Sequence, residues 1–494
     1  MDWKDEYKRK LTSAQDAVKV IKSGNRVAVG GSTDQPIILQ DTLFARKDEL
    51  RDVDIVISPM LTHTCWLQPN YEEAFQVTIG GWSGPFGRPL LLERRGYGLV
   101  PNTYHGMFVK GPELTEERQH TEMDVYLMKV SPPNENGIVS LGAHRWMKKE
   151  IADRSKIVIA EVDTNQQWFY GDTTMPASEI DLFVEYTDPM STLEGIEEAM
   201  ARTDLDEKTK KIFREVAEKI LPNVRSLFMP PLIAFPDQFM HQAEELLADP
   251  PKESAAISDH VASLIRDRDT IQLGQGSPAG YFGRLGCFDQ KHDLGVHSEV
   301  ACRGLVDLVE GGIITGKYKT VHPGKTVLQG LDNITTEETQ YCVQNPKVEV
   351  YGVSHVSDVK LIAAHDNFVS INNALSVDLT GQICFETIFD GIPVHGPGGQ
   401  PDFHLGSFFS KGGRPITVLY STAAEGTISR IVPQFDPGAV VSVGRAHACY
   451  IVTEYGIANL VGKSLKERAE AIIAIAHPDF RAELRQGAKE LFWS

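Results

Sequence analysis

The chain has 494 residues and a net charge of −18, from 49 Lys and Arg against 67 Asp and Glu. This length exceeds what one hydrophobic core usually supports, so two or more domains are expected. The acidity argues against nucleic acid or an anionic membrane surface as the main partner. An anionic ligand stays possible, because a local basic cluster or a ring of backbone N–H groups can hold one.

The sequence shows no secretion signal and no membrane segment. Residues 1–10 are charged and lack an apolar core, and no apolar run is long enough to span a bilayer. The six cysteines are scattered and form no CxxC pair. They predict reduced thiols in a cytoplasmic protein, with no metal site and no disulfide framework.

The first part of the chain alternates short apolar runs with helical stretches. An amphipathic helix is expected over Glu6–Ser23, ended by Gly24. The strand Arg26–Val29 leads into the turn Gly30–Thr33, which either brings backbone N–H groups to an anion or is simply a tight strand-to-helix turn. Further strands are expected at Asp54–Ser58, Val125–Val130 and Ile157–Val162. The alternation predicts a parallel sheet covered by helices, in an α/β domain over residues 1–190.

The middle of the chain changes character. Residues 191–267 are charged and mostly helical in pattern, and we expect a helical linker or insertion, with a lid or an oligomer contact as alternatives. A second α/β domain is expected over residues 268–494. Its expected strands lie at residues 270–273, 294–297, 320–325, 348–353, 368–371, 416–420 and 450–452. The chain is therefore expected to form two tandem open α/β domains with mainly parallel sheets. A distant duplication would explain the shared pattern, although no residue-level repeat is visible.

Four places in the second domain could line one pocket. Glu299 follows an expected strand, and a carboxylate at a strand end lies at the mouth of an open α/β sheet. The other three are the segments 274–280, 370–382 and 395–403, which are rich in glycine or in polar side chains. Glycines let a ligand approach the backbone, and free N–H groups can stabilise an oxyanion. Each feature alone has an ordinary explanation, since most single Glu residues are solvated surface and most glycines serve turns.

A set of motifs makes the sequence recognisable. They are SPPNENGIVSLG (131–142), KIVIAEVD (156–163), SEIDLFVE (178–185), LGVHSE (294–299), GIITGKYKTVHPGK (312–325), VSINNALSVDLTGQ (369–382), GPGGQPDF (396–403), STAAEGTISRIVP (421–433) and VTEYGIANLVGKSLKERAE (452–470). On these motifs the chain resembles the acetyl-CoA hydrolase/transferase family, whose members include 4-hydroxybutyrate and butyrate:acetate CoA-transferases. The resemblance covers residues 24–185 and 268–490. It implies a CoA-transferase fold and an acyl-CoA:carboxylate CoA-transferase activity.

The resemblance also implies roles for the residues of the second domain. Glu299 would be the nucleophile that attacks a short acyl-CoA such as acetyl-CoA, and ping-pong transfer would proceed through a glutamyl-CoA thioester. The backbone N–H groups of Gln275 and Gly399 would hold the oxyanion. Coenzyme A would bind as a substrate, with no permanently bound cofactor. Its expected contacts are Gly276, Ser277, Pro278, Ala279, Gly280, Leu375, Gly398, Gly399 and Phe403.

Other charged residues in the motifs have less specific explanations. Lys317, Lys319 and Lys325 either meet the CoA phosphates or are ordinary exposed lysines. We expect Arg430 and Glu454 to form ion pairs between elements rather than to take part in catalysis.

The chain departs from the family pattern at several loops, and these departures leave the substrate open. The first loop usually reads close to GIGxIP, where Gln275 and Ser277-Pro278-Ala279 stand here, and His404-Leu405 replaces the usual Arg-Gly. An acyl-CoA hydrolase, or a non-catalytic CoA-binding subunit of a larger complex, are the alternative functions. Small-molecule substrates and a homodimer or tetramer are the partners that the resemblance implies.

Overall fold

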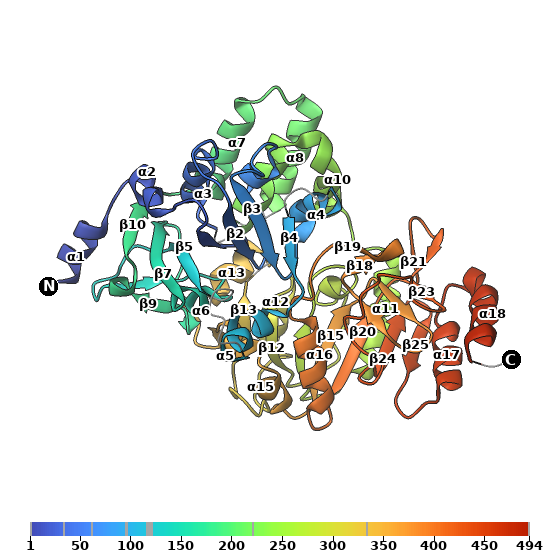
Figure 1. Cartoon of the computed structure of the whole chain (residues 1–494). Coiled ribbons are helices and arrows are strands. Elements are labelled where there is room, and N and C mark those ends of the chain that lie inside the picture. The colour runs from blue at the N-terminus through green and yellow to red at the C-terminus, as the bar shows by residue number, and fades with distance from the viewer. Residues whose placement is uncertain are drawn as a thin grey trace. The chain divides into compact units, whose positions relative to one another are not determined.

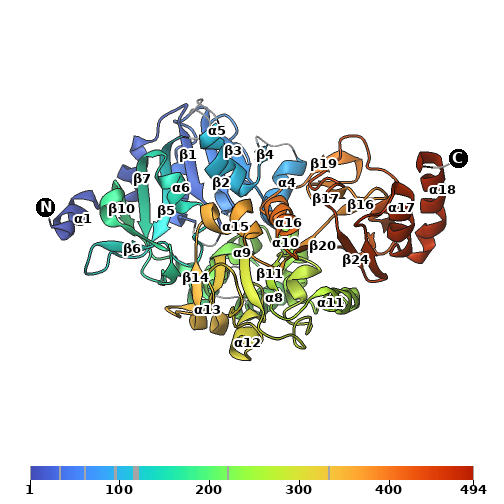
Figure 2. The same cartoon turned by 90° about the horizontal axis from the view of Figure 1, so that it is seen from below.

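The computed structural model describes residues 2–32, 35–60, 63–93, 97–114, 122–219, 222–331 and 334–492, so Thr33 of the expected glycine turn lies outside it. The chain forms two compact units, each built around a mainly parallel sheet (Figures 1 and 2). The first unit comprises Met1–Ala248 and Gln329–Ser354, and the second comprises Asp249–Leu328 and His355–Ser494. The predicted α/β fold class is confirmed.

The sheet of the first unit is parallel throughout, in the order β10-β7-β5-β1-β2-β3-β4. Its central strands are almost entirely buried, as expected for a sheet covered on both faces. Its strands are β1 (Arg26–Gly30), β2 (Val53–Ser58), β3 (Phe75–Gly80), β4 (Tyr97–Val100), β5 (Met123–Val130), β7 (Ser155–Val162) and β10 (Leu182–Glu185). Two small pairs accompany it: β6 (Ile138–Ser140) with β9 (Thr174–Pro176), and β8 (Tyr170–Gly171) with β14 (Val348–Val350).

The helices that lie wholly in the first unit are mostly short in its first half and longer after residue 193. They are α1 (Trp3–Lys10), α2 (Ala14–Ala17), α3 (Ile37–Phe44), α4 (Gly84–Leu92), α5 (Gly111–Leu114), α6 (Lys148–Ala152), α7 (Leu193–Ala201), α8 (Glu207–Lys219), α9 (Pro222–Ala234), α10 (Pro236–Leu247) and α13 (Thr336–Cys342). Helix α14 (Val353–Val356) lies where the chain passes from the first unit to the second.

The segment 191–267, expected as a helical linker or insertion, is divided between the two units. Phe86 of α4 makes edge-to-face contacts with Phe228 of α9 and Phe239 of α10, with ring centroids 5.7 and 5.0 Å apart. Burial of these aromatic rings, for which the charged sequence gives little hint, attaches α9 and α10 to the first unit. Helix α11 (Lys252–Leu264) belongs instead to the second unit, where the Ser254 hydroxyl lies 2.6 Å from that of Tyr420.

The sheet of the second unit also reverses its strand order once, although the order differs from that of the first. Its order is β25-β24-β20-β15-β11-β12-β13, with all characterised pairs parallel except β24 with β25. The strands are β11 (Thr270–Leu273), β12 (Gly295–Val300), β13 (Thr326–Gly330, in which the chain passes into the first unit), β15 (Phe368–Asn373), β20 (Arg414–Val418), β24 (Tyr450–Thr453) and β25 (Gly456–Asn459).

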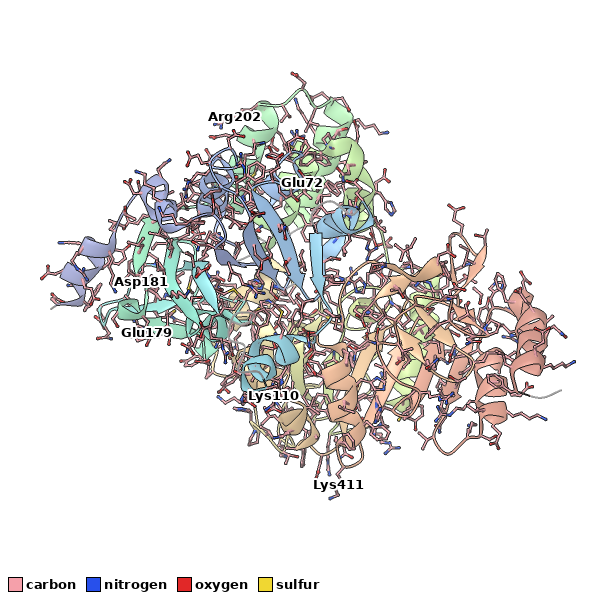
Figure 3. All side chains as sticks on the ribbon, in the orientation of Figure 1. Glu72, Lys110, Glu179, Asp181, Arg202 and Lys411 are labelled. Atoms are coloured by element: carbon pink, nitrogen blue, oxygen red, sulfur yellow. The ribbon has the colours of Figure 1, made fainter. Side chains whose placement is uncertain are left out.

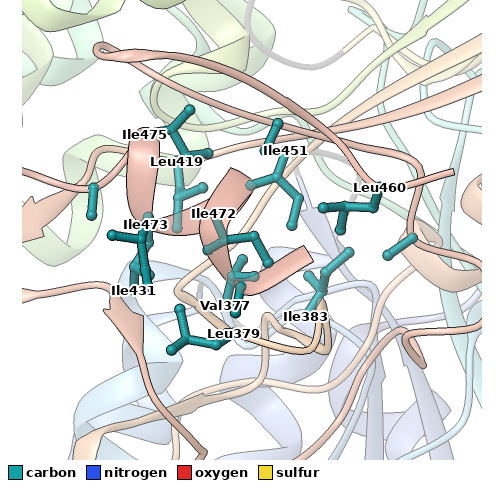
Figure 4. Packing of buried hydrophobic residues seen from close by; sticks show 14 of the residues in the cluster. Val377, Leu379, Ile383, Leu419, Ile431, Ile451, Leu460, Ile472, Ile473 and Ile475 are labelled. Atoms are coloured by element: carbon teal, nitrogen blue, oxygen red, sulfur yellow. The ribbon is translucent and has the colours of Figure 1, made fainter. Parts of the chain in front are cut away.

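A hydrophobic cluster at the C-terminal end of the second unit holds its small strands against its last helices (Figure 4). Val377, Ile451 and Ile472 are fully buried there. The remaining helices are α12 (Leu305–Glu310), α15 (Val359–Ala363), α16 (Gln400–Phe409), α17 (Leu465–Ala474) and α18 (Arg481–Phe492). The small strands are β16 (Ser376–Asp378), β17 (Ile383–Cys384), β18 (Thr387–Ile388), β19 (Ile392–Pro393), β21 (Thr422–Ala423), β22 (Ile428–Ser429) and β23 (Ile431–Val432).

Two expected elements differ from the structure. The helix expected over Glu6–Ser23 is interrupted after Lys10, because Ser13 caps a new helical turn with its side chain. The strand expected at residues 320–325 is a turn, and β13 begins only at Thr326. His322 and Gly324 both have positive φ on either side of a proline, a backbone that no strand can adopt.

The charged side chains of Arg202 and Lys411 extend outward from the surface of their units (Figure 3). Arg202 and Lys411, labelled there, form long ion pairs with Glu198 (3.7 Å) and Asp366 (3.9 Å), in which every side chain is more than half exposed. Such pairs contribute little to stability. No helix among the described residues is long and apolar enough to cross a membrane.

Candidate active site

The expected site residues of the second unit gather at the carboxyl ends of its parallel strands. The chain runs from β11 outward to β12 and β13, and then returns to place β15 on the other side of β11. The strand order therefore reverses between β11 and β15, and ligands of open α/β sheets bind at such a switch point. The loop at residues 274–280 follows β11, Glu299 stands near the end of β12, and Asn373 ends β15.

Glu299 and Gly399 lie in direct contact. A Cβ added at Gly399 would lie 2.9 Å from each carboxylate oxygen of Glu299 and 3.0 Å from its Cδ. Real Cβ atoms essentially never approach other atoms this closely, so a side chain at this position would require the carboxylate or the backbone to shift. The structure thus brings together a carboxylate and a bare backbone that are 100 residues apart in the sequence.

Gly399 also begins helix α16, and this places the carboxylate at a helix N-terminus. Gly399 is the N-cap residue, Pro401 stands in the first turn, and the preceding Gly398 has φ +59°. The first N–H groups of a helix have no partner within it, and the helix dipole adds partial positive charge there. This end of α16 therefore favours negative charge on Glu299 or on an oxyanion near it.

The first glycine loop is fixed at both ends. The Gly274 N–H donates to the Ile371 carbonyl (2.8 Å), and the Gly280 N–H donates to the Gly276 carbonyl (2.7 Å). Gly276 has φ +91°, which a residue with a side chain rarely adopts. Pro278, Ala279 and Gly280 are buried where a short 3₁₀ turn begins, so the loop presents mainly residues 275–277.

The remaining predicted CoA contacts are more internal than the sequence suggested. Phe403 is fully buried, and its ring stacks with that of Phe368 at a centroid distance of 6.4 Å. The Leu375 N–H donates to the Cys384 carbonyl (2.9 Å), and the Leu375 carbonyl accepts from Nη1 of Arg430 (3.3 Å). Phe403 therefore supports the start of α16 from within the unit.

Neutral imidazoles pack beneath the nucleophile candidate. His297, two residues before Glu299 on the same face of β12, is fully buried, and its ring lies 4.8 Å from that of His365. Burial lowers the pKa of His297 well below its usual range, and it lowers the pKa of His365 to about 4. The positive charge of Lys319 acts in the same direction on both.

An apolar cavity lies on the other face of β12. Val296, Ser298 and Val300 line it, together with Leu273 and Cys302. Side chains alternate between the faces of a strand, so this cavity does not receive the side chain of Glu299.

Several charged residues of the motifs make contacts other than the expected ones. Lys319 is buried, and its Nζ donates to the carbonyls of Val296 (2.7 Å) and Lys325 (2.8 Å), so it does not face a CoA phosphate. Arg430 and Glu454 form no direct ion pair among the described residues, although the charge of Glu454 acts to raise the pKa of Arg430. Arg430 donates to backbone carbonyls, and Glu454 accepts hydrogen bonds from Ser421.

One group of metal-type ligands occurs in the described part of the first unit: Asp41, His63 and Cys65. The Cys65 N–H donates to Nδ1 of His63 (3.1 Å), which places the proton of neutral His63 on Nε2, facing Asp41 at 3.6 Å. Burial also raises the pKa of the Cys65 thiol. The contacts within this group account for its geometry without a metal ion.

Asn373 is the site residue that sequence analysis did not single out. It lies within the motif at residues 369–382, and its side chain reaches the first glycine loop. The sequence does show an amide residue at the end of a predicted strand. It does not show that this strand lies next to the strand that precedes the glycine loop, because the strand order is not visible in the sequence.

The fold and the site together define a class of α/β protein with a carboxylate held at the switch point of a parallel sheet. Models of the acetyl-CoA hydrolase/transferase N-terminal and C-terminal domains match residues 1–76 with 100–193, and residues 336–488. The chain therefore belongs to the acetyl-CoA hydrolase/transferase family, and it is an enzyme of the CoA-transferase class.

Full-length relatives agree with this assignment. The chain is 34% identical to a 4-hydroxybutyrate coenzyme A transferase of Clostridium kluyveri, with both chains covered completely. It is 30% identical to a succinyl-CoA:cyclohexane-1-carboxylate CoA transferase of Geobacter metallireducens, covering 99% of this chain and 97% of that one. Among solved structures, RipA from Yersinia pestis covers both chains completely, with 29% identity and a TM-score of 0.79.

Proposed function

We propose that the protein transfers CoA from a short acyl-CoA to a free carboxylate, through a glutamyl-CoA thioester on Glu299. The observation that carries this proposal is the contact between the Glu299 carboxylate and the backbone of Gly399 at the start of α16. A nucleophilic carboxylate beside backbone N–H groups is what acyl transfer through an enzyme-bound ester requires. The named relatives act on acyl-CoA and carboxylate pairs.

The proposed reaction begins with an oxygen of Glu299. It attacks the thioester carbonyl, a C–O bond forms, the C–S bond breaks, and CoA leaves as a thiolate. The thiolate then attacks the glutamyl carbonyl of the resulting anhydride, which releases the first carboxylate and leaves glutamyl-CoA. A second carboxylate attacks glutamyl-CoA, and the same steps in reverse form the new acyl-CoA and restore Glu299.

Each tetrahedral intermediate carries an oxyanion, which we assign to the backbone N–H groups of Gln275 and Gly399. The helix N-terminus adds partial positive charge at the same place. CoA would lie along residues 276–280 and 398–399, with Leu375 beside it. A homodimer or tetramer stays a prediction.

Intact-protein mass spectrometry tests the proposal directly. The protein would be incubated briefly with acetyl-CoA and then with longer acyl-CoAs, with Glu299→Ala as the control. A CoA adduct on the wild type that a carboxylate acceptor removes, and that the variant lacks, is expected. Turnover to free acid without any adduct would indicate a hydrolase, and CoA binding with neither adduct nor turnover would indicate a non-catalytic subunit.

A further inference from the structure

Asn373 ends strand β15, and its side chain is enclosed by the first glycine loop. Only 9% of the residue is exposed. Nδ2 donates to the Gln275 carbonyl (2.8 Å), with the Gly276 carbonyl at 3.4 Å, and Oδ1 accepts from the Ala279 N–H (3.0 Å). The side-chain amide of Asn373 thus forms with the loop the kind of hydrogen bonds that a neighbouring strand would form through its backbone.

These contacts decide the direction of the N–H groups in the loop. A trans peptide is planar, with its carbonyl and the following N–H pointing in opposite directions. Holding the Gln275 carbonyl on Asn373 therefore fixes the peptide that follows Gln275, with the Gly276 N–H pointing away from Asn373, and it restrains Gln275, whose own N–H belongs to the preceding peptide. Gly276 can adopt many backbone conformations, so without such a contact this peptide would be free to rotate.

The same residue also contacts the second glycine loop. The Asn373 backbone carbonyl accepts a hydrogen bond from Nε2 of Gln400 (3.0 Å). Gln400 directly follows Gly399, whose backbone touches the carboxylate of Glu299. Asn373 is thus bonded to both segments on which the proposed oxyanion donors lie.

We propose that Asn373 is a positioning residue that aligns the two backbone segments holding the oxyanion during acyl transfer. This inference rests on the proposed function of Glu299. Misalignment of a donor weakens binding of the transition state more than binding of the substrate, so the effect should fall on kcat rather than on KM.

The neighbouring Asn372 provides a matched control. Its side chain forms a reciprocal amide pair with Gln272, with N–O distances of 3.0 and 3.1 Å, and it donates to no carbonyl of the two loops. Asn372 and Asn373 are both nearly buried on one strand. Asn372→Ser and Asn373→Ser therefore remove the same chemical group, but only Asn373→Ser releases the loop.

The test compares both serine variants with the wild type in steady-state kinetics. Asn373→Ser should lower kcat by about 10²-fold, the usual cost of one lost oxyanion donor, with a much smaller change in KM for acyl-CoA. Asn372→Ser leaves the hydrogen bonds between Asn373 and the loop in place, so it should lower kcat far less than Asn373→Ser, and the two melting temperatures should differ by less than about 4 °C. Equal kcat values for the two variants would overturn the proposal.

The variant Asn373→Asp distinguishes a role of this side chain in positioning the loop from a role in the overall stability of the protein. In this variant an ionised carboxylate would face two carbonyl oxygens and repel them, whereas the protonated carboxyl group can again donate to the Gln275 carbonyl. The activity of the variant relative to the wild type should therefore rise as the pH falls. A ratio that stays constant with pH would count against the proposal.

The adduct experiment distinguishes the two levels of inference. If the wild type forms no glutamyl-CoA, the proposed function fails and the role of Asn373 with it. If the wild type forms the adduct and Asn373→Ser forms it at an unchanged rate, the function stands and only the positioning role is withdrawn.

Discussion

The sheets of the two units each reverse their strand order once, but the units use the carboxyl ends of these sheets differently. In the first unit the order reverses between β1 and β5, and in the second it reverses between β11 and β15. The Gly31 N–H after β1 donates to the Ser58 carbonyl at the end of β2 (2.9 Å). Backbone atoms therefore occupy the carboxyl ends of these strands in the first unit. This contact supports the tight-turn explanation of the first glycine turn. At the corresponding end of β12 stands Glu299, against the backbone of Gly399.

Buried charge shows the same contrast. Lys129 and Asp163, both nearly buried, form an ion pair at 3.4 Å in the first unit. Glu161 accepts hydrogen bonds from the Ile37 N–H (2.9 Å) and the Leu39 N–H (3.3 Å), which caps helix α3. Burial raises the pKa of Glu161 to about 7. Judged by its shifted pKa alone, Glu161 would be taken for a functional carboxylate. Its hydrogen bonds to the backbone of α3 show that its role is structural.

Exchanging each carboxylate for its amide tests this contrast most strongly. Glu299→Gln should lower kcat by about 10⁴-fold or more, because an amide oxygen is a poor nucleophile. Glu161→Gln should leave kcat within about threefold, since its oxygens serve the backbone of α3. Steady-state kinetics of both variants provides the measurement. A similar loss in both would mean that the first unit also contributes to the chemistry.

A methyl group beside the carboxylate should have the next largest effect. Gly399→Ala would place Cβ 2.9 Å from both oxygens of Glu299, so the carboxylate or the start of α16 must shift. We expect kcat to fall by about 10²–10³-fold. Gly444→Ala is the control, because nothing lies within 4 Å of an added Cβ there. Equal activity of the two variants would contradict the contact between Glu299 and Gly399.

The first unit should lose stability as the pH rises. The folded pKa of Glu161, about 7, lies above its ordinary value of 4.5, so its contribution is complete below 4.5 and is lost as the pH rises through 7. The difference is up to about 3 kcal/mol. Denaturant unfolding at about pH 5 and about pH 8 should show this loss in the wild type and a smaller one in Glu161→Gln. An unchanged pH dependence in the variant would assign the effect to other groups.

The second unit should show an effect of opposite sign. The folded pKa of His365, about 4, lies below its ordinary value of 6.5, so its contribution is present above 6.5 and is lost as the pH falls through 4. His297 and Lys319 lie beside it. His365→Asn should therefore reduce the loss of stability between about pH 6.5 and about pH 4. An identical acid transition in variant and wild type would contradict this assignment.

The local sequence pattern was sufficient to predict an element where the element depends only on the residues within its own segment. The apolar runs before Gly30 and Ser58 predicted strands, and the structure has them as β1 and β2. Pattern was insufficient for Thr326–Gly330, because the turn before this strand depends on positive φ at His322. Nor could local pattern show what the helices after residue 191 pack against, because Phe86 contacts the distant Phe228 and Phe239.

The sequence by itself determined the family, the alternation of strands and helices, and the set of loops that carry the motifs, because these depend on residue type and spacing along the chain. The contact of Glu299 with Gly399, and the bonding of Asn373 to both glycine segments, were decided only by the tertiary structure. Such contacts join residues 27 to 100 positions apart, and they arise from the strand order of the sheet, which no local pattern encodes.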